Sequence, residues 1–373
     1  MSEVVLFELL KTQSGKQIAI ATLNSERSLN ALSHEMVALL YPQLVAWQED
    51  SNIALVLLQG AGEKAFCAGG DIVNLYENMA ACPGEYSASI ESYFTDEYQL
   101  DHLIHSYSKP FVVWGSGIVM GGGLGLMAGA SHRVVTESSR IAMPEISIGL
   151  FPDVGGSYFL NRMPDNCGLF LGLTGAAINA ADAKFINLAD HFISNADKSL
   201  FIEEIQQISW GDTIALNNEK LTSLMKKLEQ KSKVHMPLSN VHKHKALIDQ
   251  VTDSSKLEDI VAAIAQLKTD DKWLNRAQKS LAHGSALSVW LTHQLINKAK
   301  GLSLAQCLQL ELNAAVKCGK FGEFQEGVRA LLIEKDNSPA WKFASVSDID
   351  KETKDWFITS KWLAPEHPLA LLN

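Results

Sequence analysis

Two acidic residues, Glu145 and Asp153, stand in a stretch of sequence that is otherwise largely apolar (residues 143–156). The prolines and glycines of this stretch prevent a continuous helix. Carboxylates among apolar neighbours are partly desolvated, which raises their pKa and suits them to acid–base or nucleophilic catalysis. The spacing alone leaves a second interpretation open, in which each acid caps a helix beside a buried loop.

Two glycine-rich segments each follow a predicted buried strand. Residues 65–71 (Ala-Phe-Cys-Ala-Gly-Gly-Asp) follow the apolar run at 53–58, and residues 117–125 follow the run at 111–113. Glycine permits a tight turn and a close approach of the backbone to a ligand, and the N–H groups that open a helix point outward. Two such turns can aim two N–H donors at one oxygen, which is how an oxyanion hole is built. Taken singly, each turn is also consistent with an ordinary tight connection.

Other motifs suggest different chemistry, and each has a simpler explanation. Residues 123–128 match the GxGxx(G/A) pattern of dinucleotide sites, but the acid about 20 residues further on, Glu145, follows loop sequence and does not close a strand. Cys67 has no evident histidine partner and is typical of a small buried residue. His102 and His105 lack the spacing of zinc ligands, and no GxSxG motif of serine hydrolases is present. We therefore expect no metal site and no nicotinamide cofactor.

The elements that position these residues are typical of a mixed α/β fold. Apolar runs at 4–10 and 17–23 predict a hairpin, and Ser33 is suited to cap the helix that follows. The continuous apolar run at 53–58 predicts a strand buried on both faces, and shorter runs at 111–113 and 133–136 predict two more. Strands that alternate with helices indicate an α/β class.

The composition and the periodicity of the sequence change near residue 195. Glycine becomes rarer, and apolar residues at helical spacing dominate, for example over 257–267. Ser303 followed by Gln306 predicts a capping box that opens a further helix. We expect two regions, an α/β core at 1–195 and a mainly helical C-terminal region at 196–373 that packs on it.

Composition narrows the class of protein. Of the 373 residues, 20% are charged and 47% hydrophobic, which excludes a disordered or fibrous chain. The net charge of −10 argues against nucleic-acid and membrane-surface partners. Residues 111–130 carry no charge, but seven of them are glycines, which favours a buried strand, a turn and a helix start over a membrane span.

The cysteines and the N-terminus bear on location. The five cysteines lie far apart without a CxxC pair, and the N-terminal residues lack the pattern of a secretory signal. Both observations favour a reducing compartment, and we expect a cytoplasmic protein. The sequence leaves open whether the chain forms a homo-oligomer.

Taken together, these segments resemble the enoyl-CoA hydratase/isomerase (crotonase) superfamily over roughly residues 4–195. Residues 23–33 (Leu-Asn-Ser-Glu-Arg-Ser-Leu-Asn-Ala-Leu-Ser) resemble its early CoA-contacting loop, although the usual Arg-Pro is missing. The resemblance implies stacked ββα units with a helical C-terminal extension, and it places the oxyanion donors on the N–H groups of Gly70 and Gly122. It also implies three residues beside the CoA: Ala68, Asp71 and Ile72.

Within that superfamily, residues 142–156 and the C-terminal segments 326–330 and 334–341 resemble the branch that hydrolyses 3-hydroxyisobutyryl-CoA. Hydratases carry a catalytic glutamate two residues after the triple glycine, and here that position is Gly125. The resemblance implies that two acids are catalytic and also bind substrate, Glu145 and Asp153. It further implies that two other residues bind substrate, Glu97 and Gly122.

The activity implied is cleavage of 3-hydroxyisobutyryl-CoA, and of 3-hydroxypropionyl-CoA, to the free hydroxy acid and CoA, as in valine catabolism. CoA is then part of the substrate, and no separate cofactor is expected. Two other functions remain open at this point, an enoyl-CoA hydratase or isomerase and a non-catalytic acyl-CoA-binding protein.

Overall fold

The two apolar runs near the N-terminus form a β-hairpin, as predicted. The computed structural model describes residues 3–372. Its first strand, β1 (Val5–Lys11), pairs antiparallel with β2 (Gln17–Leu23). The sheet then continues through four parallel strands, β3 (Ile53–Gly60), β5 (Phe111–Gly115), β7 (His132–Val135) and β9 (His191–Phe192). β3 and β5 are buried along nearly their whole length, which explains why their sequences are continuously apolar.

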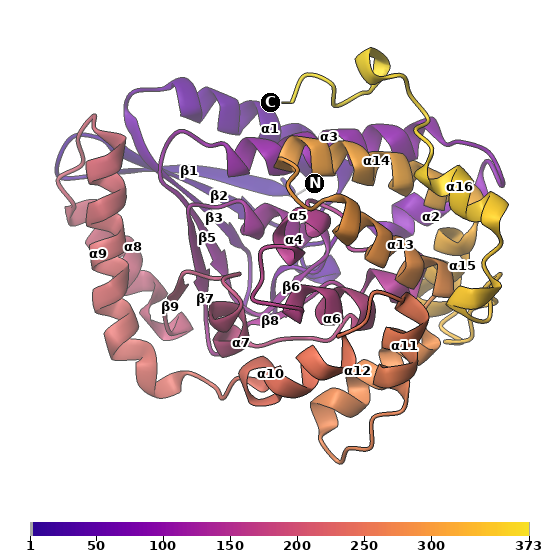
Figure 1. Cartoon of the computed structure of the whole chain (residues 1–373). Coiled ribbons are helices and arrows are strands. Elements are labelled where there is room, and N and C mark those ends of the chain that lie inside the picture. Colours follow the sequence, from indigo (N-terminus) through magenta and orange to yellow (C-terminus); the bar gives the residue numbers. More distant parts are fainter. Residues whose placement is uncertain (1–2, 373) are drawn as a thin grey trace. The chain divides into compact units, whose positions relative to one another are not determined.

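Two long helices pack on this six-stranded sheet, α8 (Lys198–Gln207) and α9 (Ile214–Ser232) (Figure 1). Their apolar side chains share one buried cluster with the strands, and the ring centroid of Phe201 on α8 lies 5.4 Å from that of Trp114 on β5. Burying an aromatic or aliphatic side chain of this size stabilises a fold by roughly 1.5–3 kcal/mol. The helices after residue 195 therefore complete the core of the N-terminal sheet.

A second sheet of three short strands carries the glycine turns. Its order is β4 (Ala65–Cys67), β6 (Ile118–Met120) and β8 (Arg140–Ala142). After β6 the chain turns at Gly121, whose φ of +47° favours glycine, and enters α4 (Gly122–Ala128). The uncharged run at 111–130 contains the predicted buried strand, turn and helix start, together with a second short strand, β6, that was not predicted. No helix within residues 3–372 has both the length and the apolar content to cross a membrane.

The chain folds into two compact units, each built from three separate stretches. The first comprises the chain up to Gly70, Leu100–Ile141 and Ile178–His242, and the second comprises Asp71–Gln99, Ala142–Ala177 and the chain from Lys243. The units do not divide at residue 195, the boundary that the sequence predicts. Glycine content and helical periodicity report local structure, whereas the units depend on which elements share a core.

The first unit also contains α1 (His34–Glu49), α7 (Ala180–Phe185) and three single-turn helices. As predicted, Ser33 caps α1, because its hydroxyl accepts the N–H of Met36 at 3.2 Å. The single turns are η1 (Glu26–Ser28), η3 (Asn195–Asp197) and η4 (Lys233–His235). Two helices contribute residues to both units, α3 (Ala88–His105) and α10 (Asn240–Val251).

The second unit is helical over the residues described. The predicted capping box is present, since the Ser303 hydroxyl accepts the Gln306 N–H and the Gln306 side chain accepts the Ser303 N–H. Its α-helices are α2 (Ile72–Ala80), α5 (Gly156–Leu160), α6 (Cys167–Thr174), α11 (Leu257–Ala265), α12 (Lys272–His283), α13 (Ala286–Lys298), α14 (Leu304–Phe321), α15 (Glu323–Val328) and α16 (Lys351–Ile358). Its shorter helical turns are η2 (Glu145–Ile148), η5 (Arg329–Ile333), η6 (Val346–Asp348) and η7 (Ala364–Glu366).

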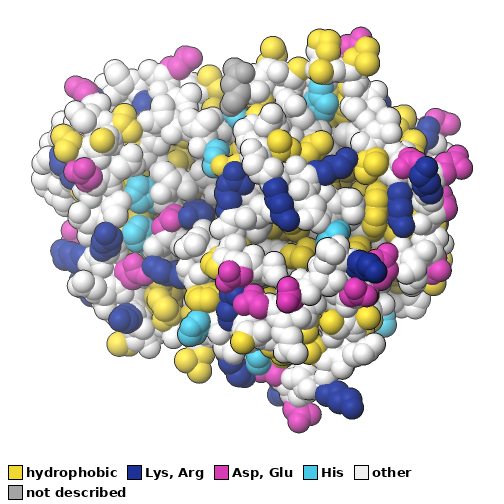
Figure 2. Space-filling view, viewed as in Figure 1, with side chains coloured by type: hydrophobic (Ala, Val, Ile, Leu, Met, Phe, Trp, Pro, Cys, Tyr) yellow, Lys and Arg dark blue, Asp and Glu magenta, His cyan; other side chains and the backbone are white. Residues whose placement is uncertain are grey.

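Charged side chains of both signs are interspersed over the face seen in Figure 2. Lysine and arginine side chains alternate there with aspartate and glutamate, and yellow apolar side chains lie between them. The net charge of −10 is therefore not gathered into one acidic patch on that face.

Candidate active site

The two glycine turns predicted to hold an oxyanion lie side by side in the first unit. β4 and β6 pair in parallel with Cys67 opposite Val119, so the turns that follow them leave the same edge of the small sheet. A Cβ added to Gly69 would lie 3.4 Å from the carbonyl oxygen of Met120. A Cβ at Gly123 would lie 2.4 Å from the carbonyl oxygen of Cys67, so only glycine fits at that position.

The N–H groups of Gly70 and Gly122 are the predicted donors of this oxyanion hole. Gly122 is the first residue of α4, and the first N–H groups of a helix have no acceptor within it. Among the backbone hydrogen bonds of residues 3–372 outside regular helices and strands, neither N–H is a donor. Both groups can therefore donate to an oxygen of a ligand.

The early loop at 23–33 packs directly against the first glycine turn. The Ala68 N–H donates to the Leu29 carbonyl at 3.1 Å, and the Leu32 N–H donates to the Gly69 carbonyl at 2.8 Å. The structure thus brings together two segments that the sequence assigned separately to CoA binding.

The other two predicted CoA contacts lie where α2 begins. Asp71 caps α2 through its side chain, which accepts the Asn74 N–H at 3.3 Å, and Ile72 is the first residue of the helix. The contacts of Ala68, Asp71 and Ile72 with CoA remain predictions.

In the second unit, three acids from three different segments come together. Glu97 projects from α3, Glu145 opens η2, and Asp153 lies in the loop before α5. Their exposed fractions are only 2%, 5% and 4%. The negative charge of Asp153 is one of the causes that raise the pKa of Glu97 and of Glu145. The carboxyl group of Asp153 therefore lies near enough to interact with both glutamates.

Burial is the main cause of the pKa shifts in this acid cluster (Glu97, Glu145 and Asp153). Burial, and then the charge of Asp153, raise the pKa of Glu97 and of Glu145 well above the ordinary value. Burial raises the pKa of Asp153 to about 7, against the opposing effect of the Tyr98 hydroxyl, which donates to Asp153 Oδ2 at 2.8 Å. With a pKa of about 7, Asp153 can lose or gain a proton near neutral pH.

Glu145 has one carboxylate oxygen without a partner. Its Oε2 is buried and accepts no hydrogen bond from the residues described. The turn after Glu145 is fixed by Gly149, which has a φ of +73° and whose added Cβ would lie 2.2 Å from the Glu323 carbonyl oxygen. A buried carboxylate with a raised pKa and a free oxygen can remove a proton from water or attack an electrophilic carbon. This geometry goes beyond the alternative of a simple helix cap.

The sequence interpretation missed the polar residues that hold these acids. Tyr98 binds Asp153, and Tyr93 donates to Glu97 Oε1 at 3.3 Å. Glu311 on α14 binds the loop after Asp153, through the N–H groups of Gly155 and Ser157. Glu311 could have been noticed in the sequence, because it is a single acid on the apolar face of the helix that follows Ser303. Its neighbours on that face are buried.

The alternative motifs have structural explanations. Cys67 is fully buried in β4, and its Sγ lies 3.6 Å from the Gly69 carbonyl oxygen, as expected of a small buried residue. Residues 123–128 form most of α4, and Glu145 opens a helical turn, so the acid does not close a strand as a dinucleotide site requires. Within residues 3–372 no three histidine, cysteine or acidic side chains are grouped to hold a metal ion.

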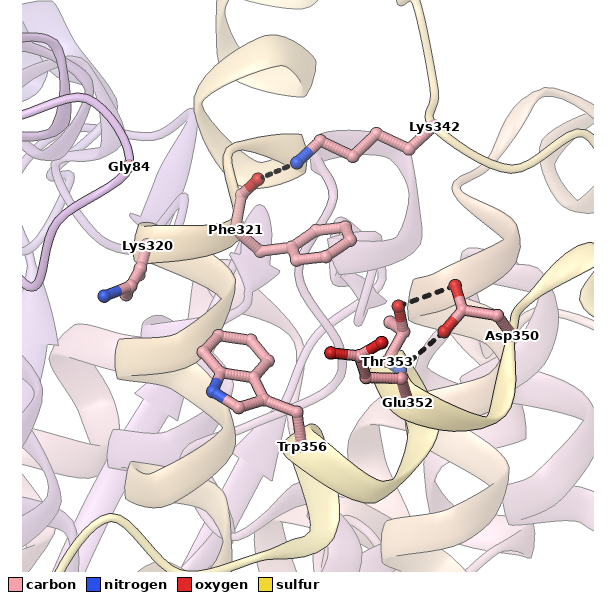
Figure 3. Close-up of a pocket in the computed structure, with 8 residues that line it drawn as sticks. All are labelled: Gly84, Lys320, Phe321, Lys342, Asp350, Glu352, Thr353 and Trp356. Carbon is pink, nitrogen blue, oxygen red and sulfur yellow. Dashed lines mark hydrogen bonds between the residues drawn. The ribbon is translucent and has the colours of Figure 1, made fainter.

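Figure 3 shows a separate pocket of about 540 Å³ in the second unit. Two of its polar side chains are engaged in hydrogen bonds: the Lys342 ammonium donates to the Phe321 carbonyl, and the Asp350 carboxylate accepts the N–H and the hydroxyl of Thr353. Gly84, Lys320, Phe321, Lys342, Asp350, Glu352, Thr353 and Trp356 line it. None of the predicted site residues is among them.

The chain is similar to known proteins in both sequence and fold. The family model described as enoyl-CoA hydratase/isomerase matches residues 18–358. The proteins named 3-hydroxyisobutyryl-CoA hydrolase, mitochondrial, from Danio rerio and Homo sapiens are each 35% identical to the chain. The alignments cover 95% and 89% of this chain, and 90% and 84% of those proteins.

Two solved structures match nearly the whole fold. An enoyl-CoA hydratase from Rhodobacter sphaeroides 2.4.1 has a TM-score of 0.82 at 30% identity, covering 96% of this chain and 98% of its own. A carnitinyl-CoA dehydratase from Mycobacterium thermoresistibile has a TM-score of 0.82 at 31% identity, covering 96% and 97%. These matches confirm the predicted α/β fold class and its extension over the C-terminal region.

Proposed function

Because the chain belongs to the enoyl-CoA hydratase/isomerase family, we propose that it hydrolyses the thioester of 3-hydroxyisobutyryl-CoA to 3-hydroxyisobutyrate and CoA. The observation that carries the proposal is the buried acid cluster, in which Glu145 has a free carboxylate oxygen beside Asp153. Relatives with 35% identity are named for this hydrolysis, which supports the same assignment.

The proposed chemistry begins at the thioester carbonyl. Its oxygen accepts hydrogen bonds from the N–H groups of Gly70 and Gly122, which makes the carbon more electrophilic and stabilises the oxyanion of the tetrahedral intermediate. Each such donor typically contributes ~10²–10³ in rate. The CoA thiolate then leaves with little acid assistance, since a thiol has a pKa of ~8.5.

Two routes use Glu145 at this step. In the first, a Glu145 oxygen attacks the carbonyl carbon, the carbon–sulfur bond breaks, and water hydrolyses the resulting acyl-enzyme anhydride. In the second, Glu145 takes a proton from water as the water oxygen attacks the same carbon. Asp153 orients the water or binds the substrate hydroxyl in either route. A single turnover in ¹⁸O-labelled water separates them, because only the anhydride route can place label in the Glu145 carboxyl group.

Hydration of an enoyl-CoA is the second candidate function. It is favoured by the two similar solved structures, which are described as a hydratase and a dehydratase. The hydratases that this chain resembles use two carboxylates to activate water. The position of one of those carboxylates is occupied by Gly125 here. A positioned acid or base contributes ~10²–10⁴ to such reactions, so we expect hydration to be slow.

One parallel assay tests these functions. The protein is mixed with 3-hydroxyisobutyryl-CoA and a chromogenic thiol reagent, and separately with crotonyl-CoA while the enone absorbance is followed. Release of thiol in the first mixture without loss of absorbance in the second supports the hydrolase. The reverse result supports a hydratase, and no change in either supports an acyl-CoA-binding protein.

We also propose the remaining properties that the sequence led us to expect. They are a second substrate, 3-hydroxypropionyl-CoA, a role in valine catabolism, and catalysis without a separate cofactor. We also propose a cytoplasmic location, to be tested by cell fractionation, although the relatives cited are named as mitochondrial proteins. Light scattering of the purified protein decides between a monomer and a homo-oligomer.

A further inference from the structure

The backbone that follows Asp153 has an unusual conformation. Val154 has a φ of +50° and Gly155 a φ of +85°, so two consecutive residues lie in the left-handed region. Glycine adopts this region readily, but a β-branched residue does so only where its surroundings enforce it. Gly155 is also the N-cap of α5 and has no side chain with which to cap the helix. Another group must therefore hold this turn.

That group is a carboxylate from a different helix. Glu311 on α14 is completely buried, and its Oε2 accepts the Gly155 N–H at 2.7 Å. Its Oε1 accepts the Ser157 N–H at 2.8 Å and also binds the Ser157 hydroxyl. The first N–H groups of a helix have no acceptor within it and favour a carboxylate. Glu311 thus caps α5 from outside the helix.

Both the backbone and the side chain of Asp153 are held by hydrogen bonds. The Gly156 N–H donates to the Asp153 carbonyl at 2.6 Å, and the Tyr98 hydroxyl donates to the Asp153 carboxylate at 2.8 Å. Leu304 of α14 packs on the turn as well, because a Cβ added to Gly155 would lie 2.9 Å from its Cδ1. The backbone of Asp153 therefore depends on α14, while its carboxylate depends on α3.

We propose that Glu311, assisted by Ser157, is a positioning residue for Asp153. By capping α5 it holds the turn at 153–157, and the turn directs the Asp153 carboxylate toward the substrate. This inference rests on the proposed function, from which Asp153 has its role. Both oxygens of Glu311 are bonded to the loop, so its contribution is to geometry and not to the chemical step.

The variant Glu311→Gln tests this role in catalysis. Its amide nitrogen faces a backbone N–H where an oxygen stood, so one bond to the turn is lost. We expect kcat for 3-hydroxyisobutyryl-CoA to fall by ~10–100-fold, the scale of a small misplacement of a reacting group. In an Asp153→Asn background the same change should cost less than about threefold, because no carboxylate is left to position. Equal losses in the two backgrounds would overturn the proposal.

Asp182→Asn is a matched control. Asp182 is also completely buried, and it accepts two backbone N–H groups, from Val241 at 2.8 Å and from Asn179 at 3.0 Å, and the Ser239 hydroxyl at 2.6 Å. The control therefore removes the same kind of bond at a place outside the proposed site. We expect it to lower the melting temperature and leave kcat within about twofold of wild type, whereas a loss of kcat equal to that of Glu311→Gln would contradict positioning.

Amide hydrogen exchange provides a readout that needs no substrate. Peptides that cover residues 153–160 should exchange faster in Glu311→Gln, and unchanged protection there would overturn the inference. If the wild-type protein cleaves no thioester, the proposed function fails while the exchange result still decides whether Glu311 holds the turn. If Glu311→Gln does not fold, Ser157→Ala replaces it, with smaller changes expected in the same directions. Unchanged kcat and unchanged exchange in Ser157→Ala would reject the proposal.

Discussion

Replacing Asp153 by asparagine should stabilise the protein, and the gain should grow with pH. Burial raises the pKa of Asp153 to about 7, from an ordinary value of 3.8. Between these two pH values the folded protein retains a proton that the unfolded chain has lost. The stability that this group contributes is therefore complete below the unfolded pKa and is lost as pH rises through the folded pKa.

The size of the effect follows from the same two values. A rise in pKa from 3.8 to about 7 corresponds to roughly 4 kcal/mol, at about 1.36 kcal/mol for each pKa unit. Asparagine does not titrate, and its side-chain oxygen can still accept the Tyr98 hydroxyl. We expect Asp153→Asn to regain up to about 4 kcal/mol at pH 8, and the gain to increase by roughly 2–3 kcal/mol between pH 5 and pH 8.

Urea unfolding of the wild type and of Asp153→Asn at pH 5, 6.5 and 8 measures this gain. The control is Asp190→Asn in the first unit. Burial raises the pKa of Asp190, but the hydrogen bonds from Arg133 outweigh burial and lower it. That variant should therefore lose stability by a similar amount at pH 5 and at pH 8. An Asp153→Asn protein that is no more stable than wild type at pH 8, or equally stabilised at all three pH values, would refute the reasoning.

Three further predictions concern activity and packing. Glu145→Gln should lower kcat by roughly 10³ or more while binding of the acyl-CoA persists, because the amide cannot act as the base or nucleophile; a variant that retains more than a tenth of wild-type kcat would exclude Glu145 from the reaction. Isobutyryl-CoA should be hydrolysed at least ~10²-fold less efficiently than 3-hydroxyisobutyryl-CoA, since a site whose acids accept a hydroxyl rejects an analogue without one; equal kcat/KM values would disprove hydroxyl recognition. Gly123→Ala should destabilise the protein by about 1–3 kcal/mol in thermal unfolding, because its methyl group would lie 2.4 Å from the Cys67 carbonyl oxygen; an unchanged melting temperature would contradict that contact.

The sequence by itself determined the features that depend on neighbouring residues. The hairpin at 4–23, the buried run at 53–58 and the capping box at Ser303 are local patterns, and each is present where it was predicted. The triple glycine likewise specified a turn and a helix start, because glycine alone tolerates the backbone conformation of Gly121. Local spacing also identified Glu145 and Asp153 as unusual acids, although it left a capping role open for both.

Only the tertiary structure decided which of these features meet. The Tyr98 hydroxyl reaches Asp153 across 55 residues of sequence, and Gly155 binds Glu311 across 156. No periodicity or turn signal extends over such separations, since these contacts arise when helices from distant parts of the chain share one core. For the same reason, the boundaries of the compact units do not coincide with the change in composition near residue 195. The raised pKa values of the acids are consequences of that shared burial, because a charge loses its hydration only when segments from elsewhere in the chain cover it.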